Sequence, residues 1–115
     1  MRDYLDKFKL TVQQIYERFC QADILIDLPC TDEDVEKLIK FCQLALDCSL
    51  NISEIEAIIK VCDQYSVRMM PFIIGAQLKA ENSNDQSAIE HEIIINQELF
   101  VNTLQHLKDI AKQII

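Results

Sequence analysis

Glycine is almost absent from this chain of 115 residues, and its scarcity constrains the fold more than any other feature. Gly75 is the only glycine, and the chain has two prolines. Hairpin turns and phosphate-binding loops need positions with positive φ, which glycine adopts without a steric penalty. The chain therefore has neither a P-loop nor a dinucleotide-binding glycine motif. The same scarcity disfavours all-β and α/β folds, so we expect an all-α protein.

Apolar residues recur at alternating spacings of three and four along most of the chain, which is typical of amphipathic helices. Leu5, Phe8, Val12 and Ile15 begin the first such stripe. The pattern predicts four helices, near residues 2–22, 31–50, 51–80 and 87–115. Short connections favour antiparallel neighbours. We therefore predict one domain, residues 1–115, folded as an antiparallel bundle of four helices.

Residues that cap helix N-termini stand at three of the predicted starts. Thr31 can cap the second helix with its hydroxyl. Either Asn51 or Ser53 caps the third helix and Ser87 caps the fourth, each with a glutamate three residues later that can complete a capping box.

Pro71 leaves one feature of the third helix open. A proline inside a helix removes the hydrogen bond to the carbonyl four residues earlier, here that of Val67, and its ring clashes there. The helix either kinks around residues 69–71, or it stops near Val67 and restarts with Pro71 in its first turn. In the second case the bundle has five helices.

Two connections differ in character. Residues 23–30 include Ile24, Leu25 and Ile26 and are unusually apolar for a loop, so we expect them to pack over the core. Residues 81–86 are all polar or charged and predict a solvated loop.

The chain shows no pattern of catalytic or metal-binding residues. His91 and His106 fall on one predicted helix about 22 Å apart along its axis, too far to share a metal ion. The five cysteines form no C-x-x-C pair: Cys20, Cys30, Cys42, Cys48 and Cys62. We therefore expect no enzymatic activity, no metal and no cofactor, although Cys42 and Cys62 form a candidate redox pair across facing helices.

Charge and hydropathy exclude further classes. The formal net charge of -8 opposes binding to nucleic acid or anionic membranes. No apolar run approaches the roughly 20 residues of a membrane span, and the N-terminus does not resemble a secretory signal. With buried reduced thiols, these features predict a cytoplasmic protein. The acidic run of Asp32, Glu33, Asp34 and Glu36 serves either a helix N-terminus or a cation or basic partner.

Half of the residues are apolar, which suggests more apolar surface than one small core can hide. On the last helix Ile93 faces the core at 100° per residue, whereas Ile94 and Val101 lie on one flank and Ile95 and Leu99 on the other. This helix is either surrounded by neighbours of its own chain or meets a second protein with one flank.

A second apolar cluster surrounds Pro71, and its methionines could line an adaptable groove. The candidate partner-binding residues are therefore Ile94, Ile95, Leu99, Val101, Met69, Met70 and Phe72. Asn96 lies on the core arc of the last helix, either as a buried amide that sets register in an assembly or at the wet edge of the arc.

The predicted function is a non-enzymatic helical protein–protein interaction module, a small subunit or adaptor of a cytosolic assembly or a homodimer. The alternative is a small acidic regulator, either an inhibitor that imitates nucleic-acid charge or a chaperone for a client protein. Mimicry would require carboxylates ordered along one surface.

Overall fold

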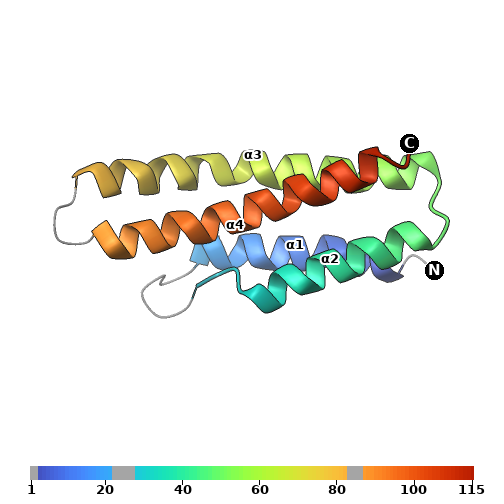
Figure 1. The fold of residues 1–115 in the computed structure, drawn as a ribbon, viewed down its shortest axis with the longest axis horizontal. Helices are drawn as coiled ribbons and strands as arrows, with labels where there is room; N and C mark the ends of the chain where they lie inside the picture. The colour runs from blue at the N-terminus through green and yellow to red at the C-terminus, as the bar shows by residue number, and fades with distance from the viewer. Residues whose placement is uncertain (1–2, 22–27, 83–86) are drawn as a thin grey trace.

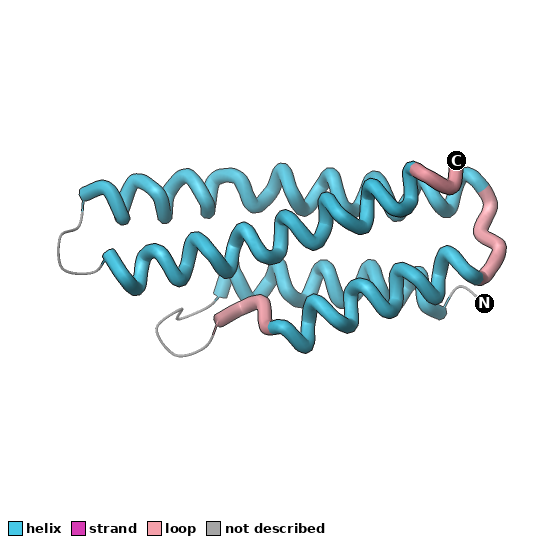
Figure 2. The backbone as a smooth tube through the Cα atoms, viewed as in Figure 1, coloured by secondary structure: helices cyan, strands magenta, loops and turns pink. Residues whose placement is uncertain are grey.

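The computed structural model describes residues 3–21, 28–82 and 87–115. These residues form four α-helices and no strand, which confirms the predicted all-α bundle. Successive helices run in opposite directions, as the colours of Figure 1 and the tube in Figure 2 show. The helices are α1 (Asp3–Gln21), α2 (Asp32–Asp47), α3 (Ile52–Asn82) and α4 (Ser87–Lys112).

Two helical hairpins make the bundle. α1 packs against α2, and α3 packs more extensively against α4. Contacts of α1 with α3 and of α2 with α4 join the hairpins. α1 begins and α4 ends at the same end of the bundle, whereas α3 ends and α4 begins at the opposite end (Figure 1).

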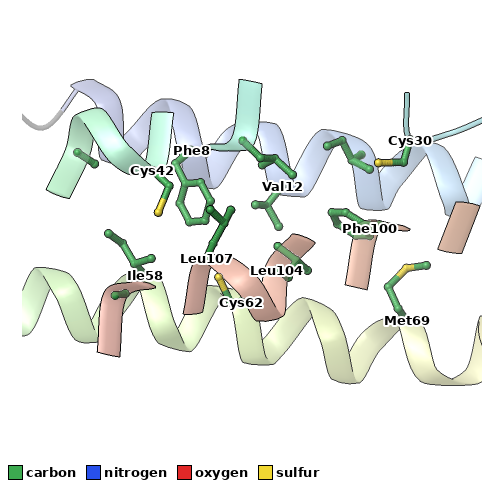
Figure 3. Packing of buried hydrophobic residues seen from close by; sticks show 14 of the residues in the cluster. Phe8, Val12, Cys30, Cys42, Ile58, Cys62, Met69, Phe100, Leu104 and Leu107 are labelled. Atoms are coloured by element: carbon green, nitrogen blue, oxygen red, sulfur yellow. The ribbon is translucent and has the colours of Figure 1, made fainter. Parts of the chain in front are cut away.

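The apolar faces of all four helices meet in one core (Figure 3). The stripe predicted for the first helix is buried from Leu5 to Phe19, and Phe19 stacks on Phe100 of α4 with ring centroids 5.6 Å apart. The largest fully buried side chains come from every helix: Phe8, Phe100, Ile15, Leu38, Ile58, Met69, Leu104 and Leu107. The helical periodicity of the sequence therefore identified the core faces.

Two of the predicted caps are present. Thr31 caps α2 in a capping box, because its hydroxyl accepts the N–H of Asp34 and the Asp34 carboxylate accepts the N–H of Thr31. At the start of α3 it is Asn51, not Ser53, whose side chain accepts the N–H of Glu54, at 2.9 Å. These side chains satisfy backbone donors that the first helical turn leaves free.

Several predictions fall outside the described residues or side chains. They concern the end of the first helix at Ala22, residues 22–27 of the apolar connection, residues 83–86 of the polar loop, and the capping interaction of Ser87. At the described end of the apolar connection, Pro29 and Cys30 are buried.

Pro71 does not split the third helix. α3 runs as one helix of 31 residues with Pro71 inside it, so the bundle has four helices over the described residues. Pro71 and Val67 are both exposed. Water can therefore reach this side of α3, where the Val67 carbonyl loses its amide donor.

The second hairpin is longer than the first. α3 and α4 contain 31 and 26 residues, against 19 and 16 in α1 and α2. Figure 1 shows α3 and α4 extending beyond α1 at the end opposite the chain termini. The radius of gyration is 15.3 Å, whereas a compact domain of this length has about 13 Å. The projecting hairpin thus exposes surface that a shorter one would not.

A candidate protein-binding surface on α3 and α4

Four large apolar side chains line one face of the C-terminal half of α3. Val67, Met70, Ile74 and Leu78, which we call the α3 stripe, are each about half exposed or more, and Val67 reaches 69%. Their spacings of three, four and four place them within about 80° of one another and over about 16 Å of helix. The α3 stripe therefore resembles the core-facing side of a helix, but it faces solvent.

The same face of α3 is mainly charged in its N-terminal half, apart from the exposed Ile52 in the first turn. Glu56, Lys60 and Asp63 lie within the same arc at 100° per residue, and all three are exposed. Asp63 forms an ion pair with Lys108 of α4. One helix face thus changes from charged to apolar near Val67, towards the part of α3 that projects beyond α1.

A groove between α3 and α4 adjoins the α3 stripe. We call it the α3–α4 groove; its volume is about 260 Å³, and it is lined by Pro71, Phe72, Gly75, Ala76, Lys79, Ile93 and Gln97. At 100° per residue Pro71 lies about 60° from Ile74 and Gly75 lies a further 40° around α3. The α3 stripe and the α3–α4 groove are therefore one continuous surface.

Gly75 is placed where the protein itself does not need a glycine. Its φ is not positive, and a Cβ added there would meet no atom of the described residues within 4 Å. Glycine in a helix interior is less stable than alanine by roughly 0.5–1 kcal/mol. The only glycine of the chain thus lowers the stability of α3 without relieving any contact within the bundle.

Gln97 of α4 is the second unfavourable residue in the α3–α4 groove. The residue is only 3% exposed, and its Oε1 atom accepts no hydrogen bond among the described residues. A buried polar group without a partner costs roughly 1–3 kcal/mol. The groove therefore combines mainly apolar walls with one carboxamide whose oxygen has no hydrogen-bond partner among the described residues.

A second groove lies on the other side of α4. It has a volume of about 460 Å³ and is lined by Leu28, Cys30, Thr31, Asp32, Glu92, Ile95, Asn96 and Leu99. Ile95 is 64% exposed at its edge. In contrast to Gln97, Asn96 is buried with both ends of its amide hydrogen-bonded. Its oxygen accepts the backbone N–H of Cys30, and its nitrogen donates to the backbone carbonyl of the same residue.

The structure separates the three candidate residues predicted near Pro71. Met70 belongs to the exposed α3 stripe, and the half-buried Phe72 lines the α3–α4 groove with its ring against Tyr16 of α1, centroids 6.1 Å apart. Met69 is fully buried in the core, because it lies on the face of α3 that packs against α4. Met69 is therefore not available to a partner at the surface.

The structure also separates the four candidates on the last helix. Ile95 and Leu99 lie together in the second groove, Ile95 exposed and Leu99 partly buried against the core. Val101 is partly buried against the core, and Ile94 is half-buried. The apolar flank with Ile94 and Val101 is thus more covered by the chain itself than the flank with Ile95.

Most residues of the α3 stripe and of the α3–α4 groove were not predicted from the sequence. Sequence reasoning did not select Val67, Ile74 and Leu78, although their helical spacing with Met70 was visible in the sequence. Gly75 and Gln97 gave no signal of their own, because neither a groove nor an unpaired amide can be read from one chain segment.

The buried thiols are poor nucleophiles. Burial raises the pKa of Cys42 to about 11 and the pKa values of Cys30 and Cys62 to about 12. All five cysteines are free; Cys20 is exposed and Cys48 partly so. Since the thiolate is the reactive form, the three buried cysteines are unreactive near neutral pH.

The other candidate groups either have structural partners within the bundle or do not lie close enough together to form a site. Asp34 of the acidic run is buried, and its carboxylate accepts hydrogen bonds from Thr31 and, at 2.8 Å, from Arg18. His91 and His106 are exposed on α4. Among the described residues no three His, Cys, Asp or Glu side chains gather as metal ligands. None of the described helices has the length and hydropathy to cross a membrane.

Comparison with models of known protein families, with curated proteins and with solved structures finds no significant match to this chain. Its function is therefore inferred from its residues and their geometry alone.

Proposed function

We propose that this protein is a helical protein–protein interaction module, a small subunit or adaptor that binds its partner through the α3 stripe and the adjoining α3–α4 groove. The observation that carries the proposal is the α3 stripe itself, four large apolar side chains at helical spacing that the bundle leaves exposed. Contiguous apolar patches of this kind on small proteins mark binding surfaces more often than scattered single residues do.

The surface area of the chain supports the same proposal. The bundle exposes 7169 Å², whereas a folded monomer of this mass exposes about 6,500 Å². The excess is of the order of the roughly 800 Å² that each partner buries in a standard interface.

Ile95 extends the proposal to a second contact. It lies on the opposite side of α4 from the α3–α4 groove and carries exposed apolar surface next to Leu28. A partner that wraps around the projecting hairpin could contact both faces, and we assign the α3 stripe the principal role because it has more exposed apolar residues.

The proposed location is the cytoplasm or another reducing compartment. Support comes from the five free cysteines, three of which are buried as neutral thiols in the core. Disulfides persist in oxidising compartments, whereas thiols of this kind are typical of reducing ones.

An acidic regulator remains the alternative function, motivated by the net charge of -8. It is less well supported, because one carboxylate of the most acidic run, that of Asp34, is turned inward to Thr31 and Arg18. Carboxylates that imitate a nucleic acid need to face outward.

Affinity purification with matched variants tests the proposed function. Ile74→Glu places a charge in the α3 stripe, whereas Ile52→Glu changes another exposed isoleucine, at the other end of α3; Ile52 is 64% exposed and Ile74 is 50% exposed. We expect a partner that is retained by the wild-type chain and by Ile52→Glu and lost from Ile74→Glu, with unchanged helicity by circular dichroism. A partner retained equally by both variants would exclude the α3 stripe as the binding surface.

A further inference from the structure

Gly75 and Gln97 face the same α3–α4 groove from two helices, and each lowers the stability of the isolated bundle. Neither residue is compensated by a contact among the described residues. Local choices in a sequence usually agree with its fold, and the positions that disagree are often functional. Two such positions in one groove indicate that the groove is completed by something outside the bundle.

Gly75 indicates how closely the occupant approaches. A Cβ added to Gly75 would have no atom of the described residues within 4 Å, and Pro71 and Ala76 beside it have short side chains. Helices whose contact positions carry small residues can approach each other more closely than the usual 8–10 Å. The wall of the groove at Gly75 is therefore suited to a second helix rather than to a loosely placed chain.

Gln97 indicates the chemistry of the occupant. The groove walls are otherwise mainly apolar, since Phe72, Ala76 and Ile93 also line it, and the oxygen of Gln97 has no hydrogen-bond partner among the described residues. A carboxamide both donates and accepts hydrogen bonds, and either end can be turned to a partner. The matching side chain is a hydroxyl or a carboxamide, since it satisfies either end of Gln97.

We propose that the α3–α4 groove binds one amphipathic helix of a partner protein. This helix lies along the α3 stripe, crosses α3 at Gly75 and carries a Ser, Thr, Asn or Gln that hydrogen-bonds Gln97. The proposal rests on the proposed function, because it names the partner of the same surface. Recognition of an amphipathic helix by an apolar groove uses anchor residues at spacings of three and four, as the α3 stripe offers.

Charge decides between a second copy of this chain and a different protein. Each copy carries a net charge of -8, so two copies repel each other as they approach. Lys79 is the one charged side chain among the described residues that line the groove. A helix with Lys or Arg on the side turned away from Lys79 is instead attracted by the net negative charge of the bundle. We therefore assign the groove to a basic amphipathic helix of another protein.

Three designed peptides and four variants test this assignment by fluorescence anisotropy. The first peptide is a 14-residue amphipathic helix with leucines at spacings of three and four, lysines on its other face and one central glutamine. The second peptide has leucine in place of the glutamine. The third peptide has glutamate in place of every lysine of the first. The variants are Gly75→Leu, which fills the groove, Gly75→Ala, Gln97→Leu and Ile74→Glu. Gly75→Ala adds only a methyl group in open space and serves to show that a change at this position leaves the fold intact.

We expect the wild-type chain to prefer the glutamine peptide over the leucine peptide and to bind the acidic peptide at least tenfold more weakly. Gly75→Leu should weaken binding of the glutamine peptide at least tenfold, while Gly75→Ala raises the thermal midpoint. Gln97→Leu should reverse the preference between the glutamine and leucine peptides. This reversal would separate a hydrogen bond at Gln97 from a general effect on the groove.

The outcomes separate the two levels of the proposal. Loss of binding in Ile74→Glu with unchanged binding and preference in Gly75→Leu and Gln97→Leu would overturn the groove assignment but keep the α3 stripe as a binding surface. Equal binding by all variants would overturn both. Light scattering that shows a wild-type dimer and a Gly75→Leu monomer would assign the groove to a second copy instead.

Discussion

The side-chain amide of Asn96 on α4 hydrogen-bonds both the backbone N–H and the backbone carbonyl of Cys30, the residue just before the capping residue of α2. Residue 30 is 66 positions away in the chain, so this contact joins the second hairpin to the first. Asn96 thus sets the position of α2 against α4 within one chain. The neighbouring Gln97 has the same chemistry and no partner for its oxygen among the described residues.

Replacing Asn96 should destabilise the bundle strongly. Asn96→Leu keeps the volume but leaves the buried N–H and carbonyl of Cys30 without partners, which should lower the free energy of unfolding by about 2–4 kcal/mol. Urea unfolding followed by circular dichroism measures the change. Asn102→Leu, at an exposed position of the same helix, is the matched control and should change the unfolding free energy by less than about 0.5 kcal/mol. A loss for Asn96→Leu as small as that of the control would show that Cys30 does not need this partner.

Replacing Gly75 or Gln97 should have the opposite effect on the isolated chain. Gly75→Ala should raise the free energy of unfolding by about 0.5–1 kcal/mol, because alanine is the better helix former and its Cβ meets no neighbour. Gln97→Leu should raise it by about 1 kcal/mol, because it removes a buried amide oxygen that has no hydrogen-bond partner among the described residues. Thermal unfolding of the monomer measures both. A loss of stability in either variant would mean that the residue serves the fold itself.

Arg18 and Asp34 form one ion pair, but removing Asp34 should lower the free energy of unfolding more than removing Arg18. The Asp34 side chain is 8% exposed and that of Arg18 is 48% exposed. Asp34→Ala removes the ion pair and the capping box of Thr31 together, so it should cost about 2 kcal/mol. Arg18→Ala leaves the capping box in place and should cost about 1 kcal/mol or less. A double-mutant cycle measures the coupling, and equal losses in both single variants would contradict the role of the capping box.

Alkaline pH should destabilise the protein through its buried thiols. The pKa of Cys42 is raised from 9.0 to about 11, and the pKa values of Cys30 and Cys62 are raised to about 12, because burial disfavours the thiolate. Between pH 9 and 11 the unfolded chain therefore releases protons that the folded chain retains. Stability should be fully present below pH 9 and fall above it, by up to about 1.4 kcal/mol per pH unit for each thiol.

Denaturant unfolding at several pH values between 8 and 11 checks this dependence. Cys62→Ala should reduce the slope of the unfolding free energy against pH, although it also lowers stability at neutral pH by creating a cavity. Lys108, whose pKa is raised by its hydrogen bond to Asp63, contributes a loss in the same direction above pH 10.5. A slope that is the same in Cys62→Ala and in the wild type would contradict the role of the buried thiol.

The turn after α2 offers a test of backbone strain. Ser49 has a φ of 57°, in the left-handed region that glycine adopts most easily. Ser49→Gly should therefore raise the free energy of unfolding by up to about 1 kcal/mol. The same substitution at Ser53, in the first turn of α3, should lower it, because glycine is a poor helix former. Equal effects at both positions would show that the turn does not strain Ser49.

Much of the fold followed from local patterns. The stripe from Leu5 to Phe19, the capping residue Thr31 and the start of α4 near Ser87 were all readable, because each depends on residues within one or two helical turns. The continuity of α3 through Pro71 was not readable. It depends on whether the Val67 carbonyl faces solvent or core, which the neighbouring helices determine.

The sequence by itself determined the helical class, the four amphipathic segments and the scarcity of glycine that excludes other folds, since these follow from local spacing and residue type. Only the tertiary structure decided which apolar faces are covered. It buried Met69 and left Met70 and Ile74 exposed, because α4 packs on one side of α3 while α1 ends short of the projecting hairpin. It also placed Gly75 in one wall of a groove, opposite Gln97, whose amide oxygen has no partner among the described residues. Neither feature can be read from a single segment of the chain, because both depend on how α3 and α4 pack.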